Sequence, residues 1–147
     1  MTTGTETALR LSRVIRADRE SVFRAWTDPA EMKKWFCPEG GTVDVAEADL
    51  SVGGRYKVVM RMPSGVHVAT GLYREIVPPS RLVFTWRWEE GEGPKEGETQ
   101  VTIELHERGD ATELVLTHEG FATADARDGH EQGWSSALGK LAARFQD

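Results

Sequence analysis

The run HEQGWSSALGKLAARF, residues 130–145, carries the pattern that decides the fold. Its large side chains recur at spacings of three or four residues, which is the period of one face of an α-helix. The residues of this face are His130, Trp134, Leu138, Leu141 and Phe145. The pattern predicts a long amphipathic helix, from about residue 125 to residue 146, that closes the chain.

Gly129, Gly133 and Gly139 lie within the expected helix. Each costs about 1 kcal/mol of helix propensity relative to alanine. We therefore expect a close backbone approach or a kink at these positions to compensate for that cost.

Before this helix, apolar residues alternate with mostly polar ones, which is the period of a β-strand. The alternating sets are Val43 and Val45; Tyr56, Val58, Met60 and Met62; Leu82, Phe84, Trp86 and Trp88; Val101, Ile103 and Leu105; Leu114, Leu116 and His118. Gly53 and Gly54 are expected to turn the chain between two strands. Within residues 66–77 both phases fit, so the inward face stays undecided. We expect six or seven mainly antiparallel strands.

Capping signals near the start of the chain predict two short helices after a first strand at about residues 9–16. Asp18 is a good N-cap for the first helix. Asp28, followed by Pro29, is a cap-and-start signal for the second. Both helices are expected to end before Pro38.

Two segments are expected to lie outside the packed fold. Residues 1–7 are small and polar, which predicts a flexible tail. The stretch EEGEGPKEGE, from Glu89 to Glu98, is acidic, rich in glycine and has no apolar anchor, so we expect a mobile hairpin loop that can be shortened. Residues 8–147 are expected to form a single α+β domain, because a chain of 147 residues needs only one core.

Charge and cysteine content exclude some functions. The 18 Lys and Arg against 24 Asp and Glu give a net charge of -6, which disfavours nucleic acid and anionic membranes as partners. Cys37 is the only cysteine, so no internal disulfide can form, and it is expected to be an ordinary packed thiol. The N-terminal run MTTGTETALR has no apolar signal core and no membrane-length segment. We expect a cytoplasmic protein without a membrane span.

The predicted order of elements has a consequence for function. A strongly curved sheet covered by one long helix cannot be filled completely by that helix, so a cavity between them is expected. Concave, mostly apolar places with a few polar groups are where small molecules bind.

Four runs of the sequence resemble one protein family. They are RVIRADRESVFRAWTDPAEMKKWF (residues 13–36), DLSVGGRYKVVMR (49–61), PPSRLVFTWRW (78–88) and HEQGWSSALGKLAARF (130–145). Together they resemble homologues of the activator of heat-shock protein 90 ATPase, in the START/Bet v 1-like (SRPBCC) helix-grip superfamily. The resemblance implies a curved antiparallel sheet, two short N-terminal helices, a long C-terminal helix across the sheet, and a hydrophobic-ligand cavity.

The candidates for the cavity wall are large residues expected on the interior of the sheet and helix. They are Trp35, Met60, Met62, Phe84, Trp86, Trp88, Leu116, His118, His130, Trp134 and Leu138. We expect them to bind a small apolar molecule, aromatic or lipid-like, without changing it chemically. Neither a cofactor nor a metal is expected, because no paired His or Cys spacing completes a metal site. The protein is expected to be a monomer or a homodimer.

Two other hypotheses remain open. The protein could be a cyclase or hydrolase acting on a polyketide-like or lactone substrate, with His118 or His130 as general acid or base and Glu47 or Glu119 as the orienting residue. Local hydrogen bonds that seat the helix on the sheet are the simpler role for both histidines. A chaperone-linked interaction module, the third hypothesis, would require an exposed apolar patch instead of an internal cavity.

Overall fold

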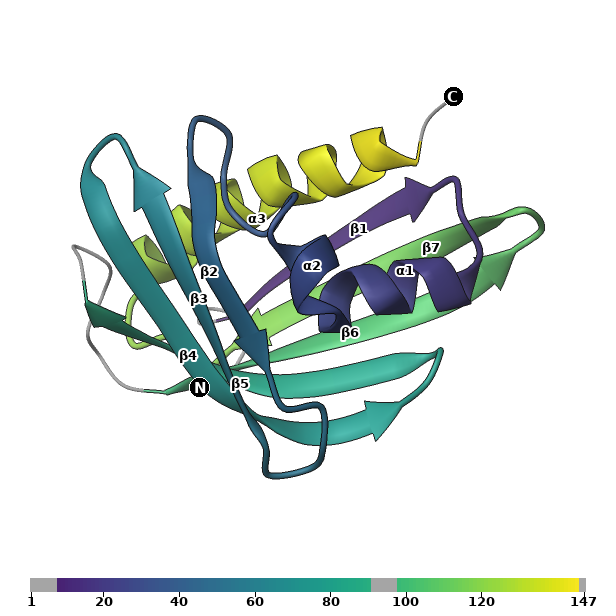
Figure 1. Cartoon of the computed structure of the whole chain (residues 1–147), viewed down its shortest axis with the longest axis horizontal. Helices are drawn as coiled ribbons and strands as arrows, with labels where there is room; N and C mark the ends of the chain where they lie inside the picture. Colours follow the sequence, from purple (N-terminus) through teal and green to yellow (C-terminus); the bar gives the residue numbers. More distant parts are fainter. Residues whose placement is uncertain (1–7, 91–97, 146–147) are drawn as a thin grey trace.

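A computed structural model describes residues 8–90 and 98–145 of the chain (Figure 1). Its elements, in chain order, are β1 (Ala8–Ile15), α1 (Arg19–Thr27), α2 (Pro29–Met32), β2 (Thr42–Ala48), β3 (Arg55–Met62), β4 (Gly65–Val77), β5 (Arg81–Glu90), β6 (Thr99–Arg108), β7 (Ala111–Glu119) and α3 (Ala124–Arg144). The expected tail, residues 1–7, and most of the expected loop, residues 91–97, lie outside the described residues. Glu89 and Glu90, which we assigned to that loop, belong to β5.

The seven strands form one sheet in the order β1-β7-β6-β5-β4-β3-β2. Every neighbouring pair is antiparallel, and β1 pairs along its whole length with β7. Figure 1 shows the strands bending around the helices. The predicted α+β fold, a curved antiparallel sheet with two short helices and one long helix, is confirmed.

Side-chain caps begin each helix. Asp18 accepts a hydrogen bond from the backbone N–H of Ser21 at 2.9 Å, and Asp28 accepts one from Ala30 at 3.0 Å, as their sequence context predicted. Thr123 caps α3 in the same way. No helix within the two described ranges is both long and apolar enough to cross a membrane.

One aromatic core joins the helices to the concave face of the sheet. The ring of Trp26, on α1, lies 4.6 Å from that of Trp35, 6.3 Å from that of Phe84 on β5 and 5.8 Å from that of Trp134 on α3. Trp26 is 2% exposed. Because α1, α3 and β5 meet at this indole and Met32 of α2 belongs to the same buried cluster, the three helices and the inner sheet face share a single core.

The expectation that Val43 and Val45 share a face is wrong. Val43 pairs with Met60 and Val45 pairs with Val59, so Asp44 is an extra residue between two consecutive partners on β3. This β-bulge shifts the alternation of inward-facing and outward-facing side chains by one residue. Val43 is buried, whereas 38% of Val45 is exposed.

A second irregularity explains why either set of alternate residues within 66–77 could be assigned to the inward face. These residues belong to one strand, β4, in which Ala69 pairs with the buried Val58 and Ile76 pairs with the buried Leu82. The register shifts between residues 73 and 75. An odd position and an even position can therefore both face the core.

Candidate functional site

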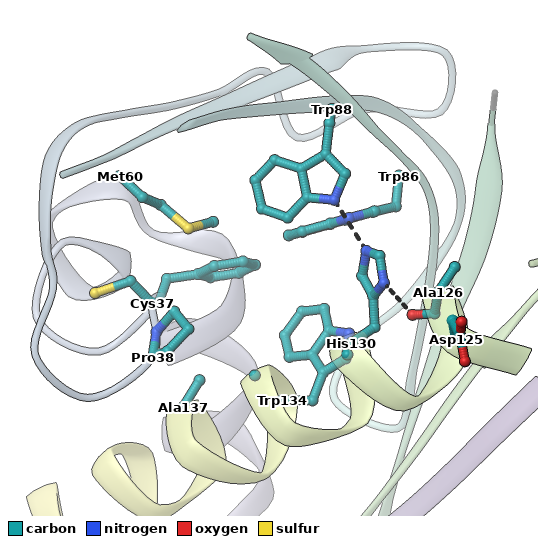
Figure 2. Close-up of a pocket in the computed structure, with 13 residues that line it drawn as sticks. Cys37, Pro38, Met60, Trp86, Trp88, Asp125, Ala126, His130, Trp134 and Ala137 are labelled. Atoms are coloured by element: carbon teal, nitrogen blue, oxygen red, sulfur yellow. Dashed lines mark hydrogen bonds between the residues drawn. The ribbon is translucent and has the colours of Figure 1, made fainter. Parts of the chain in front are cut away.

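An apolar pocket of about 290 Å³ lies between α3, the sheet and the segment that follows α2 (Figure 2). From α3 come Asp125, Ala126, Gly129, His130, Gly133, Trp134 and Ala137. The sheet and the segment after α2 supply Met60, Trp86, Trp88, Phe36, Cys37 and Pro38. The volume lies just below the usual range for small-molecule sites, roughly 300–1,000 Å³.

Two glycines keep one side of this pocket open. A Cβ atom at Gly129 would meet no other atom within 4 Å, and one at Gly133 would meet only Cγ of Pro38, at 3.6 Å. The close backbone approach that we expected at these positions is therefore wrong. Each glycine still costs about 1 kcal/mol of helix propensity. Because both residues lack a side chain, the space beside this face of α3 is empty.

Trp86 is the centre of the aromatic wall. Its ring lies 5.4 Å from that of Trp88, at an interplanar angle of 87°, and 5.2 Å from that of Trp134. On a third side it stacks on Phe36, with ring centroids 6.2 Å apart. Figure 2 shows Met60 across the pocket from Trp86 and Trp88. The wall therefore combines aromatic rings with a polarisable thioether, which suits apolar guests of varied shape.

His130 is held by a hydrogen bond on each ring nitrogen. Nε1 of Trp88 donates to Nε2 of His130 at 2.9 Å, so this nitrogen carries no proton (Figure 2). Nδ1 lies 2.7 Å from the carbonyl oxygen of Ala126, which can only accept. The proton of the neutral imidazole is therefore on Nδ1.

His118 is held in the same manner one layer deeper. Nε1 of Trp134 donates to its Nδ1 at 2.9 Å. Its Nε2 lies 2.6 Å from Oγ1 of Thr99, whose hydroxyl donates to the carbonyl oxygen of Trp86. Nε2 of His118 must therefore carry the proton and donate it to Thr99.

Burial keeps His118 uncharged. Its side chain has no exposed surface, and loss of hydration, followed by repulsion from His130, lowers its pKa well below 6.5. Both nitrogens of each histidine are engaged in the bonds just described. Neither Glu47 nor Glu119 is needed to orient them.

The pocket brings together five of the eleven predicted wall residues: Met60, Trp86, Trp88, His130 and Trp134. The other six, Trp35, Met62, Phe84, Leu116, His118 and Leu138, are not among its lining residues. Trp35 donates from Nε1 to the carbonyl oxygen of Ala25 and is fully buried. Phe84, Leu116, His118 and Leu138 are also buried, in the layer behind the pocket. Whether the lining residues bind a ligand stays a prediction.

Sequence reasoning missed the small and short side chains of the wall. Gly129, Gly133 and Ala137 recur every four residues, which places them on one helix face beside the aromatic stripe. That spacing was a usable signal. Phe36, Cys37 and Pro38 come from an irregular segment, for which no period exists to predict orientation.

The rim segment, Cys37 to Glu39, is fastened to α3. The backbone N–H of Glu39 donates to Oγ of Ser136 at 2.7 Å. Nζ of Lys140 donates to the carbonyl oxygen of Cys37 at 3.1 Å and lies 3.3 Å from its Sγ. Cys37 is 2% exposed and is thus packed, not presented to solvent.

Comparison with known proteins places the chain in a family. The model of the family described as Activator of Hsp90 ATPase homolog 1-like protein matches residues 16–146. The chain belongs to this family. The fold of the Activator of Hsp90 ATPase homolog 1-like proteins commonly binds hydrophobic ligands. No curated protein is similar enough to the chain to match it.

Solved structures with the same fold cover nearly the whole chain. A protein from Chromobacterium violaceum is 34% identical, with a TM-score of 0.85, over 96% of this chain and 98% of its own. The AHSA1 protein from Silicibacter pomeroyi is 31% identical, with a TM-score of 0.79, over 93% and 96% of the two chains. A protein from Nitrosomonas europaea is 25% identical, with a TM-score of 0.80, over 96% and 95%.

Proposed function

We propose that this protein binds a small apolar molecule in the pocket between α3 and the sheet, without changing it chemically. The glycine pair of α3 carries the proposal. Gly129 and Gly133 weaken the helix, yet neither is required by a neighbouring atom. An empty apolar space kept open at a cost in stability is what a binding site needs and what a plain core would fill.

The histidines favour binding over catalysis. A general acid or base must present a proton or a lone pair to the substrate. In His118 and His130 those positions are engaged by Trp134, Thr99, Trp88 and the backbone of Ala126. Their role in the proposal is to fix two indole rings of the wall.

Filling the glycine face tests the proposal. Gly129→Leu and Gly133→Leu would place a side chain in the space that a ligand occupies, while improving helix propensity. We expect the affinity for the uncharged fluorophore N-phenylnaphthylamine to fall about tenfold or more, equivalent to the roughly 1–3 kcal/mol that overpacking costs. Urea unfolding should show each variant to be as stable as wild type, or up to about 1 kcal/mol more stable.

Gly139→Leu is the matched control. Gly139 lies in the same helix, and its Cβ would meet only the guanidinium nitrogens of Arg13, at 3.8 Å, outside the pocket. This variant should keep wild-type affinity. Undiminished binding by folded Gly129→Leu and Gly133→Leu would move the site elsewhere. If wild type binds no uncharged apolar probe saturably, the proposal fails and an interaction module becomes the better hypothesis.

A further inference from the structure

We propose that the pocket accepts its ligand only in an uncharged form and rejects carboxylates, fatty-acid anions among them. This rests on the proposed function and adds the charge of the ligand to it. The reason is the distribution of charge and of hydrogen-bonding capacity over the pocket wall.

The formal charge on the wall is negative. Asp125 is the one ionised residue among those that line the pocket in the described part of the chain, and it is exposed in the first turn of α3. No lysine or arginine of the described ranges is among the lining residues. The whole chain carries a net charge of -6. The formal charges of the wall and of the whole chain therefore oppose the entry of an anion.

Lys140 contacts a lining residue within the described part of the chain, and it is directed to the rim segment. Its ammonium group donates to the carbonyl oxygen of Cys37 and contacts Sγ of the same residue. Lys140 does not itself line the pocket. An anion could pair with it only by competing for these contacts at the rim.

The imidazole on the wall is also uncharged in its hydrogen-bonded state. Protonation of Nε2 of His130 would set a second N–H against the N–H of Trp88, which now donates to that nitrogen. The groups packed on His130 include Trp88, His118 and Phe121, with Asp125 in the preceding helical turn. Of these, only Asp125 favours an imidazolium. The hydrogen bond from Trp88 opposes it.

A carboxylate in this pocket would lose its hydration without gaining a cation. Among the side chains of the described lining residues, the buried donor without a partner is Nε1 of Trp86. A single neutral N–H suffices for a carbonyl oxygen but does not replace the hydration of a full charge. An acid would therefore bind as its neutral form, as buried carboxyl groups do when they lack a partner.

This mechanism has a quantitative signature. If only the protonated acid binds, its apparent affinity falls about tenfold for each pH unit above its own pKa. An ordinary carboxyl group has a pKa of about 4, so at pH 7.5 the acid should bind about three thousandfold more weakly than a matched ester. An ester has no charge to lose, and its affinity should not follow this slope.

Three ligands on one aromatic skeleton provide the test: methyl naphthoate, naphthoate and naphthalenesulfonate. Each is titrated against wild-type protein between about pH 5.5 and 8 by displacement of N-phenylnaphthylamine. The pKa of the naphthoate carboxyl sets the expected slope. We expect the ester to bind with little pH dependence, the naphthoate to weaken about tenfold per pH unit, and the sulfonate, which stays ionised, not to bind.

The outcomes separate the two proposals. Equal binding of ester and naphthoate at pH 7.5 overturns the charge selectivity and leaves the apolar site standing. Naphthoate binding that is lost in Lys140→Met also overturns it, with Lys140 as the missing partner. Binding of the sulfonate that appears on acidification also overturns the charge selectivity, because an ionised sulfonate would need a cation on the wall. Failure of the ester to bind at any pH contradicts the proposed function itself.

Discussion

His118 should make the stability of the protein depend on pH in a defined window. Its side chain is fully buried and its pKa lies well below 6.5, first through loss of hydration and second through His130. In the unfolded chain the same imidazole titrates near about 6.5. Below that pH, the imidazole of His118 binds a proton in the unfolded state but stays neutral in the folded state.

The sign and size of the effect follow from this difference. Between the lowered pKa and about 6.5 the unfolded state holds more protons, so the free energy of unfolding rises with pH. Acidification from about 6.5 should therefore remove up to about 1.4 kcal/mol of stability per pH unit. Above about pH 7, His118 is neutral in both states and contributes no slope.

Urea unfolding followed by tryptophan fluorescence, at intervals from about pH 5 to 8, measures this slope. His118→Asn should reduce it while keeping an acceptor for the N–H of Trp134, at a cost of about 1–3 kcal/mol for the bond lost to Thr99. His106→Asn, on an exposed position of β6, is the control and should leave the slope in place. A wild-type profile that is flat below pH 6.5, or a slope that is undiminished in His118→Asn, would refute the reasoning.

Two further variants test the helix start and the pocket wall. Asp28→Ala removes the cap on Ala30 and should lower the free energy of unfolding by about 1 kcal/mol without changing probe affinity; a large loss of affinity at unchanged stability would show that Asp28 acts in binding. Trp134→Ala should weaken N-phenylnaphthylamine binding by about 1–3 kcal/mol and cost about 3–5 kcal/mol of stability, because Trp134 both lines the pocket and packs on Trp26. Saturable binding that survives in folded Trp134→Ala would place the site elsewhere.

The periodicity of the sequence was sufficient for the fold but not for its irregularities. Alternation located the inner faces of β3, β5, β6 and β7, because a regular strand points every second side chain to the same side. It failed at Val45, where one extra residue in β2 reverses the phase. Such a bulge depends on the pairing partner, which a single strand's own sequence does not specify.

For the site, periodicity predicted the face of each residue but not its depth. Leu116, His118 and Leu138 do lie on inner faces, yet they are covered by other side chains and form the core behind the pocket. Depth depends on what packs above a residue, and that comes from other elements. The sequence showed that the glycines lower helix propensity. That they leave room for the pocket became visible only from the empty space beside Gly129.

The rim of the pocket joins parts of the chain that are far apart in sequence. The bond from Glu39 to Ser136 spans 97 residues, and the contact of Lys140 with Cys37 spans 103. Seven of the thirteen lining residues belong to α3, which follows every strand in chain order. Contacts of such large separation form late, because the loop that they close is long. A growing chain thus has no ligand site until α3 has docked, so ligand binding reports completed folding and not merely a formed sheet.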